Sequence, residues 1–294
     1  DPAVEQPDKA LALMANLAFP NEPDLQAETH YVLLQGHAQL SQVAQAEAAL
    51  AALEKFEKFP QLSQAAYAVG RAYVEESKRK KAAGDAKAAV EAADRSARYL
   101  ALAVQKRAEP RFQDFLWIAA TLKELERYPQ AIEMLRQTEQ RFAAQAGDSI
   151  WDARRMIADC YIALQDWKGA LDVFKQLVTK EPDVLVYRRE LARCYENAGQ
   201  YDDALREWRD VSQRAKGGTP DWYLSKYHLV ANYCHKQNFP RAYEILSLTM
   251  DLHPDMGGPE SAKKFKDLVQ AKFPAEFKQK VAQLEAELAQ GAKP

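Results

Sequence analysis

The sequence is poor in glycine and cysteine and has no long apolar run. Its 294 residues include 11 glycines and three cysteines. Glycine is the usual residue of tight turns and of phosphate-binding loops, so its scarcity argues against β-sandwiches and against glycine-rich nucleotide sites. No apolar run approaches the roughly 18 residues that indicate a membrane span, so we expect no membrane insertion in this segment.

An excess of one charge is also lacking. The chain has 40 Lys+Arg against 42 Asp+Glu, a formal net charge of −2. A general nucleic-acid binder carries a basic patch on the scale of a domain, so we expect no nucleic-acid partner. The charged run 75–81 (EESKRKK) is predicted to be a solvated helix end at a stretched turn.

Signatures of catalysis and of metal binding are absent from the sequence. It contains no phosphate-binding loop, HExxH, GxSxG or dinucleotide-binding fingerprint. His30 and His37 are seven residues apart, as are His228 and His235, which is about 10.5 Å along a helix and too far to share a zinc ion. We therefore predict no catalytic residue, no metal and no cofactor.

The three cysteines, Cys160, Cys194 and Cys234, form no CxxC pair and are predicted to be small buried residues. They do not settle the redox compartment. The chain begins at Asp1 rather than Met, which we interpret as processing or trimming. A soluble domain in the cytoplasm or in a bacterial periplasm fits equally well.

Alanine, by contrast, is abundant, with 51 residues in the chain and 25 in the first hundred. Alanine is the best helix former, so this composition predicts an all-α protein. Apolar residues also recur at helical spacing, and Pro182, Pro220 and Pro254 stand where one helical pair would pass to the next.

The clearest internal repeat spans 151–184, and its pattern returns 34 residues later. Ala158, Tyr161 and Ala170 are followed in register by equivalent alanine and tyrosine residues, and Cys160 by a second cysteine. The later positions are Ala192, Cys194, Tyr195 and Ala204. A third copy follows a four-residue insertion around 217–220, and looser copies precede the first.

This pattern resembles the tetratricopeptide repeat family, whose unit is a 34-residue helical hairpin. The resemblance implies a right-handed α-solenoid of about six such hairpins, with a lone N-terminal helix and C-terminal capping helices. We expect an N-terminal extension with one helix over 1–25, a repeat array over 26–254 with its best units in 112–254, and capping helices over 255–294.

The two ends differ from the repeats. Residues 8–19 predict one helix before Pro20. Near the C-terminus, Phe277, Val281, Leu284 and Leu288 form an apolar stripe that suits a capping helix, with a coiled-coil dimer seam as the alternative. We therefore expect a monomer, or a dimer formed through the terminal helices.

The resemblance also implies a concave groove lined by the first helix of each hairpin. In the family register, nine residues would face this groove and bind a partner: Lys123, Arg155, Asp159, Arg189, Arg193, Glu196, Asn197, Tyr227 and His235. Arg155, Arg189 and Arg193 would line one wall and suit an acidic or C-terminal segment of a partner protein.

An intramolecular ladder is the alternative for these arginines, with Asp152, Asp159 and Glu196 as their neutralising partners. Chaperone-binding members of the family clamp a carboxylate with Lys and Asn. Here Asp159 and Arg193 replace the expected Asn, so a chaperone co-factor is not expected.

The function indicated is a non-catalytic scaffold or adaptor for protein–protein interaction, with the groove or the convex face as its docking surface. One alternative is a structural spacer or assembly subunit of a larger complex, for example in an envelope or secretion system. Another is a repeat array appended to a catalytic domain that is absent from this chain.

Overall fold

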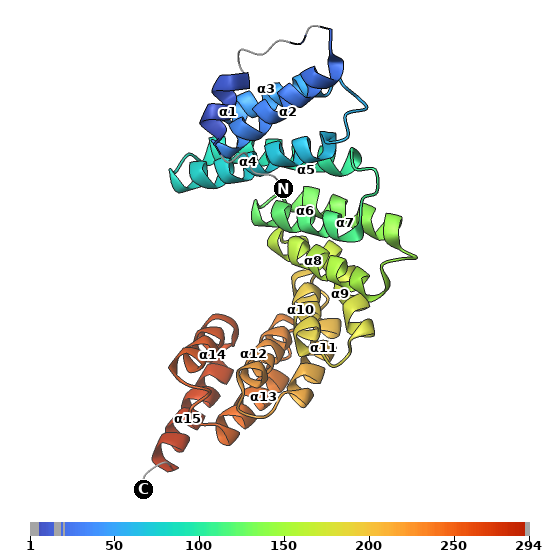
Figure 1. The fold of residues 1–294 in the computed structure, drawn as a ribbon. Helices are drawn as coiled ribbons and strands as arrows, with labels where there is room; N and C mark the ends of the chain where they lie inside the picture. The colour runs from blue at the N-terminus through green and yellow to red at the C-terminus, as the bar shows by residue number, and fades with distance from the viewer. Residues whose placement is uncertain (1–5, 15–18, 20, 292–294) are drawn as a thin grey trace. The chain divides into compact units, whose positions relative to one another are not determined.

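The computed structural model describes residues 6–14, 19 and 21–291. Within those ranges the chain forms fifteen α-helices, one short 3-10 helix and no strand (Figure 1). The all-α prediction is therefore confirmed. None of the described helices is both long enough and apolar enough to cross a membrane.

The chain divides into two compact units, Asp1–Cys160 and Tyr161–Pro294, and the boundary falls inside one helix, α8 (Ile150–Ala163). We call these the first and the second unit. The three segments expected from the sequence, 1–25, 26–254 and 255–294, remain predictions of the domain organisation.

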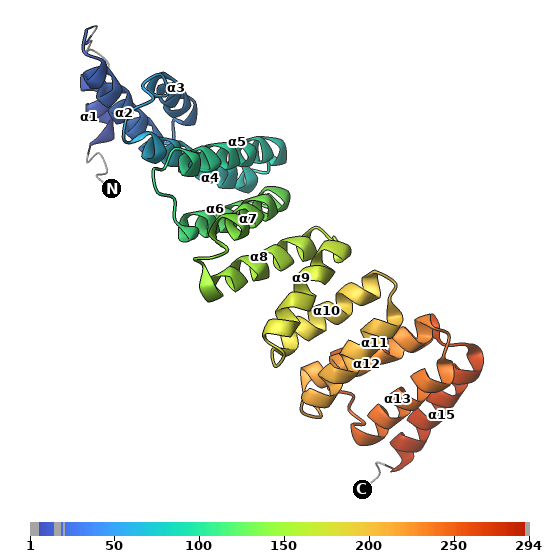
Figure 2. The ribbon, with the colours of Figure 1, turned by 90° about the vertical axis from the view of Figure 1, so that its right-hand side faces the viewer.

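The first unit is built from helical hairpins (Figure 2). Its helices before α8 are α1 (Pro7–Met14), α2 (Pro23–Gln39), α3 (Val43–Leu53), α4 (Leu62–Ala82), α5 (Ala86–Gln105), α6 (Phe112–Glu124) and α7 (Tyr128–Phe142). Helices α2 and α3, α4 and α5, and α6 and α7 pair as hairpins, while α1 packs on α2. Residues 15–18 of the predicted helix 8–19 lie outside the described residues.

Helix α4 corrects one sequence-based expectation. The charged run 75–81 forms the C-terminal end of this 21-residue helix, as predicted, but the chain there is helical and not a stretched turn. No proline or glycine interrupts the chain between Gly70 and Gly84, and Gly84 takes the left-handed conformation (φ 79°) that ends the helix. The extra residues of this copy therefore lengthen its helices.

A polar cluster ties three helices of the first unit together. The Glu47 carboxylate on α3 accepts hydrogen bonds from Tyr73 on α4 and from Tyr99 on α5, each at 2.5 Å, and pairs with Arg95 at 2.7 Å. Burial raises the pKa of Glu47, but these donors outweigh burial and hold the pKa below its ordinary value. The cluster therefore stabilises the fold above the unfolded pKa of this carboxyl, and the contribution is lost as the pH falls through the folded value.

The second unit continues the hairpins. Its further helices are α9 (Trp167–Lys180), α10 (Leu185–Asn197), α11 (Tyr201–Arg214), α12 (Pro220–His235), α13 (Phe239–Leu252), α14 (Pro259–Lys272) and α15 (Ala275–Gly291). Helix α12 contacts α14, and α13 contacts α15. The C-terminal pair therefore covers the hairpin before it, first helix on first helix and second on second (Figure 1).

The repeat register is visible in the burial of its side chains. The small residues Ala170, Ala192 and Ala204 are fully buried, as is the large Trp208. Phe174, Tyr161 and Tyr195 are also buried, as the register predicts. Trp151, which the register also places in the core, is only half buried: it is the second residue of α8, and the Arg154 guanidinium lies 4.5 Å from its ring centroid.

Asp166 and Asp183 each precede a helical run, a position from which a carboxylate can cap a helix, and only one of them does. Asp166 caps α9, since its carboxylate accepts a hydrogen bond from the Gly169 backbone N–H at 2.9 Å. Asp183 is not a cap: Val184 occupies that position of α10, and Asp183 pairs with Arg214 at 2.9 Å.

The first prediction concerns the core register. Phe174→Ala and Tyr195→Ala should each lower the free energy of unfolding by about 3–5 kcal/mol, because each leaves a cavity between packed helices. Val186→Ala is the matched control: its side chain is 48% exposed, so the change should stay within about 0.5 kcal/mol. Urea unfolding followed by far-ultraviolet circular dichroism measures all three. Wild-type stability in the two aromatic variants would show that the register is wrong.

The second prediction concerns α14 and α15. Phe265 and Val281 line an apolar cleft together with Leu246 and Met250 of α13, so a chain lacking 259–294 would expose α13 to water. We expect a lower thermal midpoint and concentration-dependent aggregation, measured by thermal melts and light scattering. Removal of 289–294 alone is the control and should change neither. Equal solubility and equal midpoint after the long deletion would show that these helices are not a cap.

Candidate functional site

The nine residues predicted to face a groove all lie on first helices of hairpins, but in two units. Lys123 is on α6, and Arg155 and Asp159 are on α8, all in the first unit. Six belong to the second unit: Arg189, Arg193, Glu196 and Asn197 on α10, and Tyr227 and His235 on α12. The expected strip of three arginines is thus divided between the two units: Arg155 belongs to the first, and Arg189 and Arg193 belong to the second.

In the first unit, the predicted groove residues pair with acidic neighbours. Lys123 on α6 forms an ion pair with Asp159 on α8. Arg155 pairs with Asp152, one turn earlier on the same helix, at 2.5 Å. These contacts follow the intramolecular alternative for Arg155 and Asp152.

In the second unit, the arginines also have acidic partners, although not those expected. Arg189 donates to Asp221, at the start of α12, at 2.8 Å, and Arg193 pairs with Glu190 at 2.9 Å. Glu190 lies three residues before Arg193 on one helix face, so it is the nearest available carboxylate. Among the residues that the structure describes, Arg193 forms no ion pair with Glu196, although that pair was expected.

Glu196 instead joins α10 to the two helices that follow. Its carboxylate accepts hydrogen bonds from the Trp208 indole at 2.7 Å and from the Asn232 amide, and it lies 3.0 Å from His228 Nδ1. The His228 ring stacks on Trp208, with centroids 4.2 Å apart and planes 4° apart. Only 17% of the Glu196 side chain is exposed. Its carboxylate therefore joins packed helices and contributes little to an open groove surface.

Asn197 contacts its own helix, and His235 contacts the hairpin that precedes its own. The Asn197 amide donates to the Arg193 carbonyl at 2.8 Å, and the exposed His235 ring stacks on Tyr201 at 4.9 Å. Neither Asn197 nor His235 lines the cleft between α10, α12 and α14.

A cleft of about 670 Å³ lies between α10, α12 and α14 of the second unit. It brings together Arg189 and Tyr227, two of the predicted residues, with Lys264 and Phe265 of α14. Tyr227 and Phe265 meet edge to face at 5.7 Å. Both cations have acidic partners in the wall, Asp221 for Arg189 and Glu260 for Lys264, the latter at 2.9 Å. The cleft therefore combines an apolar aromatic floor with cations that can exchange one carboxylate for another.

The contribution of α14 was missed because the sequence assigned this helix to a cap. A signal for it exists, however. The start of α12 follows Gly217-Gly218 and carries Pro220-Asp221, and the start of α14 follows Gly257-Gly258 and carries Pro259-Glu260. This repeated glycine, proline and acid order marks both as first helices of a hairpin.

The cysteines offer no reactive group to either unit. All three are buried, and burial raises the pKa of Cys160 and of Cys234 to about 11 and that of Cys194 to about 12. Such thiols stay protonated at neutral pH and are poor nucleophiles. Among the described residues, no group of histidine, cysteine and carboxylate side chains could hold a metal ion.

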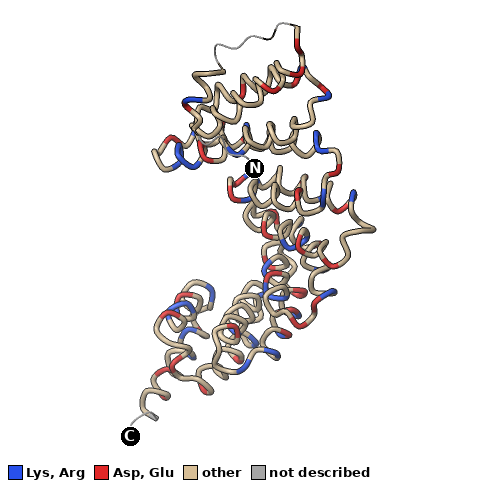
Figure 3. The backbone as a smooth tube through the Cα atoms, viewed as in Figure 1, with Lys and Arg blue, Asp and Glu red and all other residues tan. Residues whose placement is uncertain are grey.

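Charges of both signs are interspersed along the helices of each unit, as Figure 3 shows. The pattern agrees with the near-zero net charge of the sequence. The described residues of each unit therefore form no broad field of one sign.

Solved structures with low sequence identity resemble the chain. A putative kinesin light chain with TPR-like repeats from Podosopora anserina is 20% identical, covers 62% of this chain and 92% of its own, and has a TM-score of 0.43. YrrB, described as a TPR protein with an unusual peptide-binding site, is 19% identical over 66% of this chain and 91% of its own, with a TM-score of 0.44. The apo form of RapI is 14% identical over 97% and 82%, with a TM-score of 0.49. None of these similarities indicates what this chain binds, and no curated protein matches it.

Two family models match the chain, and both describe the tetratricopeptide repeat. One matches residues 118–184 and the other residues 161–226. They cover the hairpins from α6 to α11 and reach the start of α12. Together with the helical hairpins and the buried repeat residues, these matches show that residues 118–226 consist of tetratricopeptide repeats, a repeat that serves as a general scaffold for protein interaction.

Proposed function

We propose that this chain is a non-catalytic adaptor that binds an acidic or C-terminal segment of a partner protein between the first helices of its second unit. The observation that carries the proposal is the cleft of about 670 Å³ in which Arg189, Tyr227, Lys264 and Phe265 meet. Guanidinium and ammonium groups suit a carboxylate, and the two rings suit an adjoining apolar side chain.

The acidic partners of these cations bear on the strength of binding. A carboxylate that enters the cleft must replace Asp221 at Arg189 or Glu260 at Lys264, and the released acid must then be solvated. Asp221 and Glu260 are more exposed than Arg189, with side-chain exposures of 42% and 87% against 27%. Water can therefore take over the displaced acids at small cost, and the exchange gives modest, salt-sensitive affinity.

A structural spacer is the second candidate, because stacked hairpins whose ion pairs are satisfied need no ligand. The intramolecular pairs of Lys123, Arg155 and Arg193 favour it. The two candidates differ in their sensitivity to substitutions in the cleft: a spacer keeps its function when Arg189 changes, whereas an adaptor does not.

The third prediction tests the adaptor directly. Arg189→Glu combined with Arg193→Glu should lower the affinity for peptides with a free C-terminal carboxylate at least tenfold, because a repulsive charge replaces an attractive one at Arg189. Fluorescence anisotropy with a panel of fluorescein-labelled peptides, each compared with its C-terminal amide, measures the loss. High salt should weaken wild-type binding.

The matched control is Arg206→Glu, on α11 of the same hairpin. Arg206 pairs with Asp203 at 2.7 Å, is 63% exposed and does not line the cleft. It should leave the affinity unchanged. Thermal melts separate the candidates: lost stability with unchanged binding in the double variant would favour the spacer and would move the partner site to another face or to the terminal helices.

A further inference from the structure

The first unit contains a cleft of its own, of about 840 Å³, between α2, α4 and α6. All the residues that line it belong to this unit, and none of them is among the nine residues predicted to bind a partner. Its chemistry differs from that of the cleft in the second unit, so it does not depend on the function proposed above.

A partly exposed aromatic pair forms one part of this cleft. The rings of Tyr67 on α4 and Trp117 on α6 lie 5.1 Å apart with their planes tilted by 45°. Trp117 is 36% exposed, although most large apolar side chains of the unit are buried. The half-buried Tyr67 ring and the exposed Trp117 ring provide an apolar surface for another aromatic or apolar side chain.

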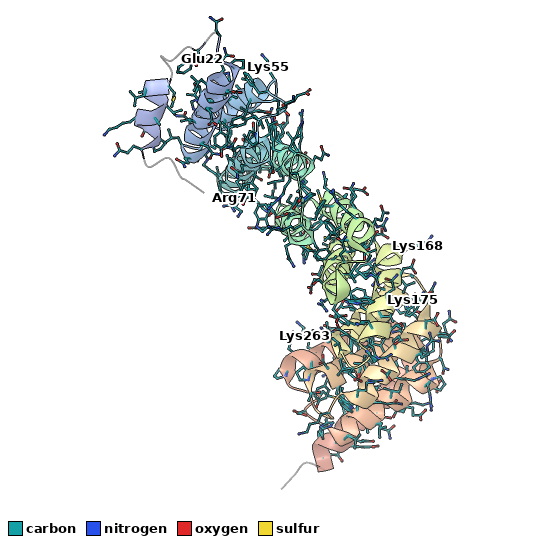
Figure 4. All side chains as sticks on the ribbon, turned by 45° about the vertical axis from the view of Figure 1, so that its right-hand side comes forward. Glu22, Lys55, Arg71, Lys168, Lys175 and Lys263 are labelled. Carbon is teal, nitrogen blue, oxygen red and sulfur yellow. The ribbon has the colours of Figure 1, made fainter. Side chains whose placement is uncertain are left out.

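An unpaired guanidinium lies beside these rings. Of the two arginines that line the cleft, Arg107 pairs with Asp114 at 2.8 Å. Arg71 is exposed and makes no hydrogen bond or ion pair with any residue that the structure describes (Figure 4). Glu75, one turn further along α4, lies 3.9 Å from Lys78, which pairs more closely with Glu124 at 2.8 Å, and it makes no ion pair with Arg71 among the described residues. An incoming carboxylate therefore need displace no acid from Arg71.

The spacing of Tyr67 and Arg71 determines which two residues of a bound peptide could contact them at the same time. Tyr67 and Arg71 are four residues apart on α4, which places them on one face, about 6 Å apart along the axis. In an extended peptide, side chains two residues apart point to the same side and lie about 6.6 Å apart. An acidic residue and an aromatic residue separated by one position would thus reach Arg71 and the ring pair together.

The rest of the lining suits a peptide backbone. Gln35, Gln64 and Gln113 border the cleft from α2, α4 and α6. Each side-chain amide carries a donor and an acceptor, the complement of a peptide group. Glu75 adds selectivity, because it would repel a second acid placed two positions beyond the first.

We propose that the first unit binds an extended peptide segment in which an acidic and an aromatic residue are separated by one residue, with the acid on Arg71 and the ring on Tyr67 and Trp117. The partner is a protein that exposes such a segment. Because the segment needs no chain end, this site is independent of terminal-carboxylate binding in the second unit.

The fourth prediction is tested with capped, fluorescein-labelled peptides and the full chain. We expect saturable binding of peptides containing Glu-Ser-Phe or Phe-Ser-Glu, measured by anisotropy. Peptides in which Gln replaces Glu, or in which Glu and Phe are adjacent, should bind at least about tenfold more weakly, since one contact is lost. Arg71→Gln and Trp117→Ala should weaken the two parent peptides to the same extent. No binding of either parent peptide to the wild-type chain would overturn the proposal.

A charge exchange makes the test specific to Arg71. Arg71→Glu should lose the Glu-containing peptides and gain affinity for the corresponding Lys-Ser-Phe and Phe-Ser-Lys peptides. Lys55→Glu is the matched control, because it makes the same change of net charge at an exposed site well away from Arg71 in Figure 4, and it should change neither affinity. Equal losses for Arg71→Glu and Lys55→Glu would show a general charge effect and would contradict the proposal.

Two further measurements complete the design. Circular dichroism should give the same helix content for each variant. Arg189→Glu tests the second unit as the alternative site for these acidic peptides: binding that is lost with Arg189→Glu and kept with Arg71→Gln would overturn the proposal. A second copy of the chain is the competing occupant of the cleft. Self-association in sedimentation that is lost with Trp117→Ala, without peptide binding, would overturn the proposal in favour of a dimer.

Discussion

A single helical hairpin cannot bury its own apolar face, and this constraint governs both units. Each pair therefore depends on the neighbouring pair to cover it. The buried alanines Ala170, Ala192 and Ala204 allow helices to approach closely, while Trp208 and Phe174 fill the space that remains. Carboxylates reinforce this packing from within: Glu47 gathers side chains from α4 and α5, and Glu196 gathers side chains from α11 and α12. First helices contribute to this packing and still leave one face open, and the two clefts lie on those faces.

The fold could be predicted from the sequence because packing residues recur at a fixed interval. The 34-residue return of Ala158, Cys160 and Tyr161 at Ala192, Cys194 and Tyr195 reflects contacts that every hairpin must make. The errors occurred where the interval changes. Helix α4 contains a seven-residue stretch that a 34-residue repeat pattern places at a turn, and Trp151, in the first turn of α8, is only half buried.

The candidate sites were less predictable, because they depend on pairings between side chains of different helices. A register can place Arg189 and Arg193 on one face, but it cannot show that Asp221 takes the first and Glu190 the second. Nor does it distinguish Glu196, enclosed by Trp208 and Asn232, from an open groove residue. Arg71 escaped notice for the opposite reason: its significance is the lack of a partner among the described residues, which becomes visible only when the surrounding helices are in place.

The reactivity of the three buried cysteines can report local opening of the chain. Cys160, Cys194 and Cys234 lie on the first helices of three successive hairpins, and their burial keeps the thiols protonated and shielded. A thiol reagent can modify each one only when its hairpin opens, so the rate at each cysteine measures the free energy of that opening. Three unequal rates would mean that the hairpins open one at a time, and a common rate would mean that they open together. The cooperativity of the array can therefore be measured hairpin by hairpin without introducing any label site.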